Sequence, residues 1–463
     1  MKKIIFRSLF VILLVALAWA IHYAWVSFPI ISGFDAKQVC TCIFVSNRTK
    51  ESIDSGEMSQ YPFSMAKYEI NMQDSSVTAS VFGLAKRKAI YRKGIGCTLI
   101  NDFTEAQVRS QTFSIPSPPP VNTDSISFPY GDKINDTIPS NINTAKLNAA
   151  VDAAFTESIA RKKQRTRAVI VVYDGKLVAE KYAPGFTKDT KMYGWSMAKS
   201  VGSALMGTLV EQRKLDIKKP APVPEWSNIN DPRHAITIED LLHQMSGLDF
   251  LEDYSKASDI TNMLYKKGDM AAFTADHSLA HQPGTVFNYS SGNSNVLSRI
   301  IRQTVGEKDY AAYPFTALFY KVGMYNTLIE PDASGTYVNS SYVNATAKDY
   351  ARFGLLYYYD GIWNGERILP EGWVKQTVTS PSSNKLKNYG YQFWLNGIDK
   401  NHPAQHEFPD VPADMFYCDG YAYQGIFIIP SKKLVVVRLG LTLDKSFDTN
   451  AFLKSIINAI KPI

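Results

Sequence analysis

The sequence predicts an α+β protein whose antiparallel sheet is built from both ends of its main domain, with helices between them. Two hairpin patterns predict this. Residues 167–183, RAVIVVYDGKLVAEKYA, contain two β-rich runs around the turn signal Asp174-Gly175. Residues 425–442, GIFIIPSKKLVVVRLGLT, repeat the pattern with a turn at Pro430–Lys433. The chain between the hairpins has largely helical patterning, which predicts a helical subdomain that flanks the sheet.

Two of the intervening helices are marked by their first and last residues. In ITIEDLLHQMSGL, Thr237 is the expected N-cap with Asp240 three residues later, and Gly247 is the expected stop. NATAKDYARFGLLYYYDG follows the same logic, with Thr346 as the expected cap and Gly361 as the closing glycine.

Size and composition indicate an ordinary globular protein. The chain has 463 residues, of which 45% are hydrophobic and 20% charged. Its formal net charge of +7 is modest for this length, and the richest basic cluster, Arg161–Arg167, has no interleaved aromatic residues. We expect this cluster to be a solvated helix end before a strand, and we expect no nucleic-acid partner.

The N-terminus predicts a membrane anchor or signal segment over residues 1–32. Three basic residues precede an almost unbroken apolar run from Leu9 to Ile31, which is long enough to cross the hydrocarbon core of a bilayer. The basic flank would remain in the cytoplasm, so the body of the protein is expected to be exported to the cell envelope. The AWA triplet at Ala18–Ala20 would suit a signal peptidase, so a cleaved signal remains the alternative to an uncleaved anchor.

The rest of the chain divides into three parts. Residues 33–110 predict a small accessory region of short strands, residues 111–142 a Pro-rich extended linker, and residues 143–463 the main domain.

The cysteines agree with an exported protein. A disulfide from Cys40 or Cys42 to Cys97 is expected, and the spacing does not decide between the two. No histidines stand at ligand spacing near these cysteines, so we expect no metal site.

A serine and a lysine lie one helical turn apart in residues 193–207, YGWSMAKSVGSALMG. Apolar residues at three- and four-residue spacing predict a helix, and its small residues predict close packing. Ser196 falls at the helix N-terminus, where free N–H groups stabilise developing negative charge, and Lys199 lies on the same face. A buried lysine needs a polar partner or a lowered pKa, and a neutral lysine can accept the serine proton. The alternative is a capping serine and a lysine that extends to solvent.

A second motif lies in residues 281–301, HQPGTVFNYSSGNSNVLSRII, where Tyr289-Ser290-Ser291 precedes an apolar helix. Taken with Ser196-x-x-Lys199, this order of motifs resembles the serine-reactive β-lactamase/penicillin-binding-protein superfamily. The likeness is closest to its class C-like branch of esterases and 6-aminohexanoate-dimer (nylon-oligomer) hydrolases. The superfamily's S-x-x-K corresponds to Ser196–Lys199, and its tyrosine motif, Y-x-N or Y-x-S, to Tyr289–Ser291.

The resemblance covers roughly residues 145–463 and includes LLHQMSGL at residues 241–248. This segment is similar to the family's L-L-x-H-x-S-G-L, with His243 displaced by one position.

The resemblance implies a β-lactamase/transpeptidase-like fold and an exported serine hydrolase that forms an acyl-enzyme and needs no cofactor. Ser196 would attack a carbonyl, with Lys199 and Tyr289 accepting and relaying its proton. The backbone N–H groups of Ser196 and Tyr421 would bind the oxyanion. The candidates for substrate contact are Trp195, Ser291, Gly420 and Gln424.

One departure from the superfamily affects the expected substrate. Its β-lactamases and peptidases carry K-T-G where this chain has Cys418–Gly420. An acidic Asp419 would not help to hold a substrate carboxylate, so we expect esters or amides rather than β-lactams. The nylon-oligomer branch has a G-x-G-G-Q-like segment at residues 420–424, and here Ala422 and Tyr423 replace its two glycines.

Two alternatives remain at this point. One is a true β-lactamase or D,D-peptidase, against which the missing K-T-G counts. The other is a non-catalytic envelope protein that binds a ligand, against which the intact serine, lysine and tyrosine count.

Overall fold

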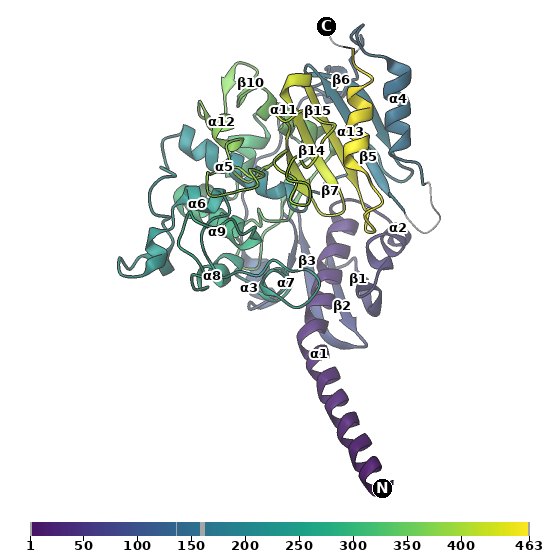
Figure 1. The fold of residues 1–463 in the computed structure, drawn as a ribbon, viewed down its shortest axis with the longest axis vertical. Coiled ribbons are helices and arrows are strands. Elements are labelled where there is room, and N and C mark those ends of the chain that lie inside the picture. The colour runs from purple at the N-terminus through teal and green to yellow at the C-terminus, as the bar shows by residue number, and fades with distance from the viewer. Residues whose placement is uncertain (1, 136, 158–162, 462–463) are drawn as a thin grey trace. The chain divides into compact units, whose positions relative to one another are not determined.

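The computed structural model describes residues 2–135, 137–157 and 163–461, and they form two compact units (Figure 1). Unit 1 contains the chain up to Ser110, together with Leu251–Met270 and Asp332–Gly335. Unit 2 contains the remainder. Of the basic cluster Arg161–Arg167, the first two residues lie outside the described residues, and a strand begins at Thr166.

Unit 1 combines a long helix, α1 (Lys2–Phe44), with an antiparallel sheet of order β1-β2-β3-β4. The short strands expected in residues 33–110 are confirmed. Their bounds are β1 Ala66–Asn71, β2 Ser76–Val81, β3 Leu84–Arg92 and β4 Gly96–Leu99, and the other helices of the unit are α2 Lys50–Ser55, α3 Glu105–Ser110 and α7 Asp259–Lys266.

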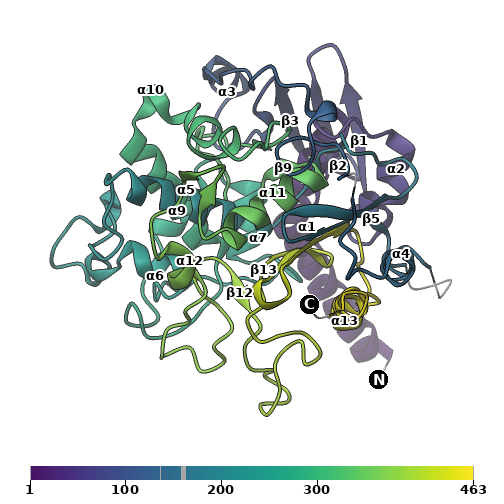
Figure 2. The ribbon, with the colours of Figure 1, turned by 90° about the horizontal axis from the view of Figure 1, so that it is seen from above.

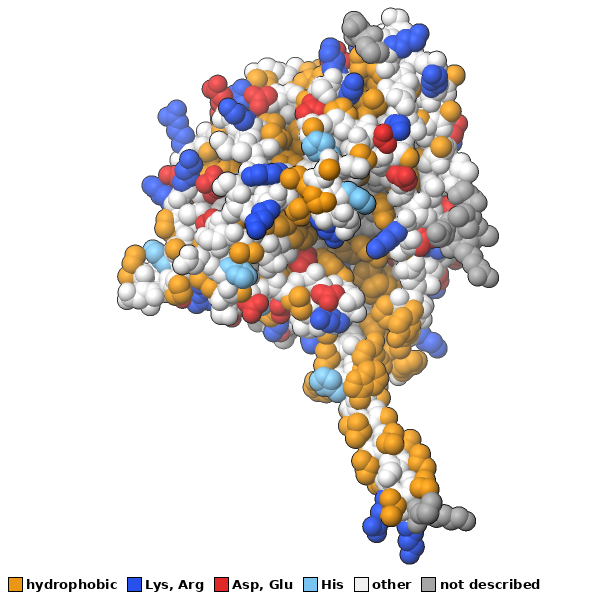
Figure 3. Space-filling model, viewed as in Figure 1, with side chains coloured by type: hydrophobic (Ala, Val, Ile, Leu, Met, Phe, Trp, Pro, Cys, Tyr) orange, Lys and Arg blue, Asp and Glu red, His pale blue; other side chains and the backbone are white. Residues whose placement is uncertain are grey.

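Helix α1 crosses the expected boundary at residue 32 without interruption. Its first half is exposed and apolar, as the orange side chains along the helix show in Figure 3, with Trp25 81% exposed. From Phe28 onward the helix is buried against β2 and β3, so its second half is core rather than connector. Within the described residues, α1 is the one helix that is long and apolar enough to cross a membrane.

Unit 1 also recruits residues from the middle of the chain. Helix α7 packs on α1, and the rings of Phe34 and Tyr265 meet edge to face at 5.6 Å. Helix α7 packs there because one of its sides carries apolar residues, such as Met263 and Leu264, which are stabilised by burial against another apolar surface. Residues 143–463 are therefore not confined to one unit.

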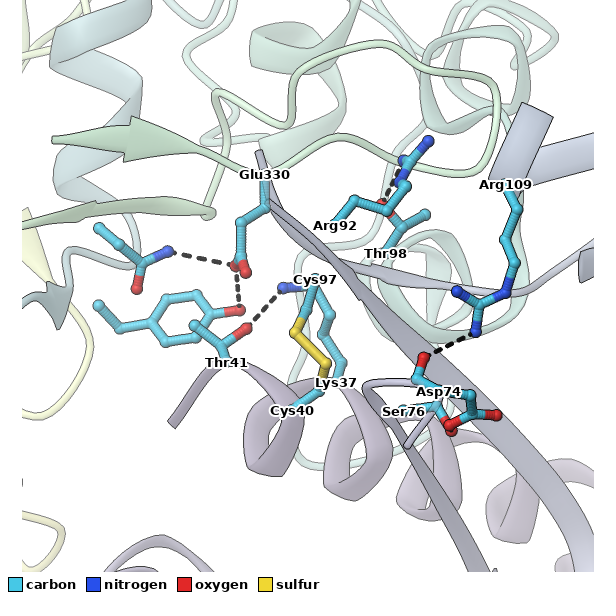
Figure 4. Close-up of a disulfide and its surroundings, with 12 residues drawn as sticks. Lys37, Cys40, Thr41, Asp74, Ser76, Arg92, Cys97, Thr98, Arg109 and Glu330 are labelled. Carbon is cyan, nitrogen blue, oxygen red and sulfur yellow. Dashed lines mark hydrogen bonds between the residues drawn. A yellow bond between two sulfur atoms is a disulfide. The ribbon is translucent and has the colours of Figure 1, made fainter. Parts of the chain in front are cut away.

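A disulfide joins α1 to β4 through Cys40 and Cys97 (Figure 4). It decides between the two pairings that the sequence left open, since Cys42 is a buried thiol outside the disulfide. The bridge closes a loop across 57 residues, and such cross-links typically contribute about 2–4 kcal/mol by restricting the unfolded chain.

Unit 2 is built on a sheet of order β12-β13-β14-β15-β5-β6, in which β15 pairs antiparallel with β5. The strands are β5 Thr166–Tyr173, β6 Lys176–Tyr182, β12 Trp394–Leu395, β13 Phe416–Gly420, β14 Gln424–Ile429 and β15 Leu434–Gly440. Both predicted hairpins are confirmed, and Asp174 and Gly175 adopt the positive φ values of 47° and 77° that their turn requires. Strands from both ends of the main domain therefore close one sheet.

Helices cover both faces of this sheet (Figures 1 and 2). One face packs against α5 (Met197–Glu211) and α11 (Ala347–Tyr358), and the other carries α4 (Thr144–Ala153) and α13 (Thr449–Ile457), which lie side by side. Alternate residues of β5 serve the two cores, with Ile170 facing α5 and α11 and Val171 facing α4 and α13.

The helical region holds the remaining short elements of the chain. They are α6 Ile238–Leu242, α8 Met270–Ala275, α9 Ser291–Val305, α10 Glu307–Tyr310, α12 Trp373–Thr377, β7 Met192–Tyr193, β8 Leu328–Ile329, β9 Val343–Ala345, β10 Ile362–Trp363 and β11 Glu366–Arg367.

The two predicted helix starts are confirmed, but one predicted stop is wrong. Thr237 forms a capping box with Asp240, and Thr346 caps α11, which ends three residues before Gly361. Helix α6 ends at Leu242, well before Gly247, because Gln244 takes a left-handed φ of 60° and cannot continue the helix.

Part of the expected linker, residues 111–142, is fixed to unit 2 rather than free. The buried guanidinium of Arg352 on α11 donates to the Pro129 carbonyl at 2.8 Å and to the Asp132 carboxylate at 2.7 Å, and it pairs with Asp349. This charged cluster holds the second half of the segment against α11.

Candidate active site

Helix α5 positions the serine and the lysine. Ser196 occupies the N-cap position, but its side chain makes no capping hydrogen bond and is partly accessible. The small residues of α5 permit close packing, since a Cβ added at Gly202 would lie 3.0 Å from the Asn339 Cβ. The helix is therefore central, as its pattern predicted, and the serine hydroxyl is not used in capping.

Lys199 is buried at the base of the site, with only 1% of its surface exposed. Its Nζ donates to Ser196 Oγ at 3.0 Å, to Ser291 Oγ at 2.9 Å and to the Ser340 carbonyl at 2.9 Å. Three acceptors match the three N–H bonds of an ammonium group. The alternative of a lysine that extends to solvent is wrong, and the expected change in its pKa stays a prediction.

Tyr289 lies beside the lysine, whose Nζ is 4.9 Å from the centre of the tyrosine ring. The chain places it there because α9 begins directly afterwards, with Ser290 as a side-chain cap. The Trp394 ring lies 5.4 Å from the Tyr289 ring, centre to centre, and forms a wall behind it. The structure thus brings Ser196 and Lys199 of the α5 N-terminus together with Tyr289, which lies just before α9.

Two backbone N–H groups are unoccupied near the serine. Neither the N–H of Ser196 nor that of Tyr421 donates a hydrogen bond to another described residue. Strand β13 passes close to the serine segment, since a Cβ at Gly420 would lie 2.6 Å from the Gly194 carbonyl oxygen. Gly420 is therefore needed for close backbone approach, and free N–H groups in such a position suit a developing oxyanion.

Trp195 holds a strained backbone next to the serine. Its φ is +48°, in the left-handed region that a tryptophan rarely adopts. The ring stacks on Tyr193 at 5.1 Å and meets the edge of Tyr421 at 5.5 Å, and the residue is half-buried. Trp195 therefore remains a candidate for substrate contact.

Two other candidates for substrate contact have different surroundings. Ser291 is fully buried and accepts the hydrogen bond from Lys199. Gln424 is also buried, and its amide donates to the Tyr193 carbonyl at 2.9 Å. Both side chains contact groups that carry or precede the serine and so help to position the site, and their contact with substrate stays a prediction.

Sequence reasoning missed the turn between β13 and β14 and the arginine behind it. Ala422 and Tyr423 have φ values of 66° and 63°, which explains why related sequences can use glycine here. The buried guanidinium of Arg438 donates to both of their carbonyls at 3.0 Å and lies 4.1 Å from the Phe447 ring centre. A charged residue inside the apolar strand LVVVRLG was the available signal.

A buried amide network, also missed, fixes the tyrosine segment. The Gln244 carbonyl oxygen accepts from the Ser290 N–H at 3.1 Å and from Asn293 at 2.9 Å, and its amide nitrogen donates to Gln392 at 3.2 Å. The amide of Gln392 in turn bonds the carbonyls that end α6. The left-handed conformation of Gln244, which ends α6 early, thus places its side chain against Ser290, the residue next to Tyr289.

The residues in the K-T-G position lie on opposite faces of β13. Cys418 faces α5, and burial raises the pKa of its thiol far above the usual range. Asp419 faces the other way and keeps solvent access, although surrounding protein atoms raise the pKa of its carboxyl against the opposing effect of the Lys199 charge. Among the described residues, no group of three His, Cys, Asp or Glu side chains is arranged to hold a metal ion.

Comparison with known proteins agrees with this arrangement. A family model described as Beta-lactamase matches residues 151–451. A 6-aminohexanoate-dimer hydrolase from Paenarthrobacter ureafaciens is 26% identical over 260 residues, which are 51% of this chain and 65% of that protein. The matched region therefore spans slightly less than two thirds of that relative.

Solved structures share the fold at low identity. A family VIII carboxylesterase superposes with a TM-score of 0.53 at 14% identity, over 71% of this chain and 99% of that one. A penicillin-binding protein homolog from Caulobacter crescentus gives 0.51 at 15% identity, over 70% of this chain and 98% of that one. These structures confirm the predicted α+β fold of the β-lactamase/transpeptidase type. By the family match over most of unit 2, the chain belongs to the beta-lactamase family of serine hydrolases.

Proposed function

We propose that this protein cleaves ester or amide bonds of small molecules through an acyl-enzyme on Ser196. The observation that carries the proposal is the buried Lys199, whose Nζ lies 3.0 Å from an accessible serine hydroxyl that has no capping role. A serine hydroxyl becomes an effective nucleophile when a base stands within hydrogen-bond reach.

The residues account for each step. Ser196 Oγ attacks the carbonyl carbon while its proton passes to Lys199. The carbonyl oxygen then carries negative charge, and the N–H groups of Ser196 and Tyr421 donate to it. Lys199, together with Tyr289, returns the proton to the leaving alcohol or amine. Water attacks the acyl carbon by the same proton route, which releases the acid and restores Ser196.

The substrate class follows from what stands at the K-T-G position. Asp419 and the buried Cys418 offer no positive charge to a β-lactam carboxylate. The named relatives, a 6-aminohexanoate-dimer hydrolase and a carboxylesterase, act on amide and ester bonds, which supports the same chemistry here.

Relative rates test this assignment. The full chain in detergent should hydrolyse p-nitrophenyl acetate at least 100-fold faster, in kcat/KM, than it hydrolyses nitrocefin, because nothing at Asp419 compensates the carboxylate of a β-lactam. Comparable rates would favour a β-lactamase. Absence of any turnover, with no covalent label on Ser196, would favour a non-catalytic binding protein.

We also propose that α1 anchors the protein in a membrane and that unit 2 is exported. The support is the exposed apolar half of α1, preceded by basic residues. The full chain should remain in the membrane pellet after extraction at pH 11, and a chain beginning at residue 27 should not. Recovery of both in the supernatant would contradict the anchor.

A further inference from the structure

A hollow of unit 2 lies along β13, on the face that carries α13. Its volume is about 630 Å³, and its walls come from β12, β13, β14 and the segment that leads into α13. Asp419, Tyr417 and Trp394 all line it. The mechanism proposed above uses none of these side chains, so the hollow has no role yet.

The hollow adjoins the proposed active site. Asp419 directly precedes Gly420, which packs against the Gly194 carbonyl two residues before Ser196. Trp394 contacts the hollow on one side and the Tyr289 ring on the other. Asp419 lies on β13 and Tyr421 begins the turn that follows it, so two residues, or at most about 7 Å of chain, separate them. A substrate held on the Tyr421 N–H by its carbonyl would therefore place a group up to about 7 Å away beside Asp419.

Three carboxylates line the hollow; Asp448 caps α13, and the other two have no partner among the described residues. Asp419 and Glu407 line it, and neither forms an ion pair or a side-chain hydrogen bond with another described residue. Tyr417 is only 7% exposed, and its hydroxyl bonds to no described residue. Lys445 is the one basic residue among those that line the hollow.

The remaining walls are aromatic. Trp394, Tyr417, Tyr423 and Phe447 line the same hollow as the two unpaired carboxylates. Aromatic faces attract cations, and an ammonium group between such faces and a carboxylate is a recurrent arrangement for quaternary ammonium ligands. Neither a carboxylate-bearing nor a purely apolar substrate would benefit from these carboxylates.

We propose that this hollow binds a cationic ammonium group and so selects, for the hydrolase, substrates that carry one within about 7 Å of the scissile carbonyl. The substrate part of this inference rests on the proposed function, whereas the binding part does not. Desolvation raises the pKa of the Asp419 carboxyl against the effect of the Lys199 charge, and a bound cation would favour the ionised carboxylate.

Binding is tested first, without turnover. The full chain in detergent is titrated by calorimetry with choline and with its uncharged isostere, 3,3-dimethylbutan-1-ol. Choline should bind saturably and at least tenfold more tightly than the alcohol. Asp419→Asn should remove most of this difference, and the control Asp152→Asn should not, because Asp152 lies on α4 outside the hollow and pairs with Lys181.

Turnover is tested with the matching thioesters, acetylthiocholine and 3,3-dimethylbutyl thioacetate. The ratio of their kcat/KM values should exceed about ten for the unmodified chain and fall towards one in Asp419→Asn. Equal binding of choline and the alcohol, or a preference unchanged by Asp419→Asn, would overturn the cation site. Choline binding that depends on Asp419, without hydrolysis of either thioester, would support the site and contradict the hydrolase.

Discussion

At the scale of single residues, the decisive feature is the position of Lys199. A lysine with 1% exposure would be costly to bury without partners, and here it has three acceptors, two of them serine hydroxyls. A lysine with a purely structural role needs hydrogen-bond acceptors, but none of them has to be accessible to substrate. One of these acceptors, however, is the accessible hydroxyl of Ser196, which the helix does not use as a cap. This arrangement favours proton exchange over a purely structural role.

Replacing this lysine should separate activity from folding. Lys199→Met, which is similar in volume and uncharged, should lower kcat/KM for p-nitrophenyl acetate by about 10²–10⁴, because the serine loses its base. The protein should still fold, with a thermal midpoint lowered by a few degrees, since Ser291 and the Ser340 carbonyl each lose a donor.

The exposed Lys214, which lies just beyond the end of α5, provides the matched control. Lys214→Met should leave both activity and thermal midpoint unchanged. Retention of more than a tenth of the activity in Lys199→Met would remove the lysine from the mechanism.

At the scale of elements, the turn between β13 and β14 shows how a loop is held in an unfavourable conformation. Ala422 and Tyr423 both lie in the left-handed region, which costs L-residues roughly 1–2 kcal/mol each. The turn persists because Arg438 binds both carbonyls from below. Burial lowers the pKa of this arginine, but a guanidinium with this many acceptors remains charged at neutral pH. The same turn carries the Tyr421 N–H, so its geometry matters for the oxyanion.

A glycine in this turn should therefore stabilise the protein. Ala422→Gly removes the steric cost of the positive φ, but glycine loses more backbone entropy on folding than alanine does. We expect a net increase of about 0.5–1 kcal/mol in the free energy of unfolding. The thermal midpoint should rise by about 1–3 °C. The control is Ala149→Gly on the exposed face of α4, where glycine should lower it instead. A fall in both variants would contradict the account of the turn.

Sequence patterns predicted some elements well and others poorly, for physical reasons. Hairpins with Asp-Gly turns and helices with Thr caps depend on local chemistry, so the β5–β6 turn and the starts of α6 and α11 could be foreseen. The early end of α6 depends on Gln244 reaching Ser290, a contact 46 residues away that no local signal reveals. The acceptors of Lys199 likewise include a carbonyl at residue 340, which carries no signal in its side chain.

At the scale of the whole molecule, the compact units do not coincide with the consecutive segments that the sequence predicts. Helix α1 was expected to end as an anchor at residue 32, yet its second half forms the core of unit 1 together with α7 from the middle of the chain. Boundaries predicted from sequence depend on changes in composition, whereas compact units depend on which residues are buried together. One apolar helix can therefore be long enough to cross a membrane and also form part of a protein core. The proposed catalytic residues, by contrast, all lie within unit 2.

The central claim is that Ser196 is the acylated nucleophile, and covalent labelling tests it most directly. The full chain in detergent is treated with a fluorophosphonate probe, digested, and mapped by mass spectrometry. We predict a single labelled peptide with the adduct on Ser196, and no label in Ser196→Ala. That variant should unfold within about 2 °C of the unmodified chain, because the hydroxyl makes no capping bond. A label on another serine, or none on the folded protein, would contradict the account.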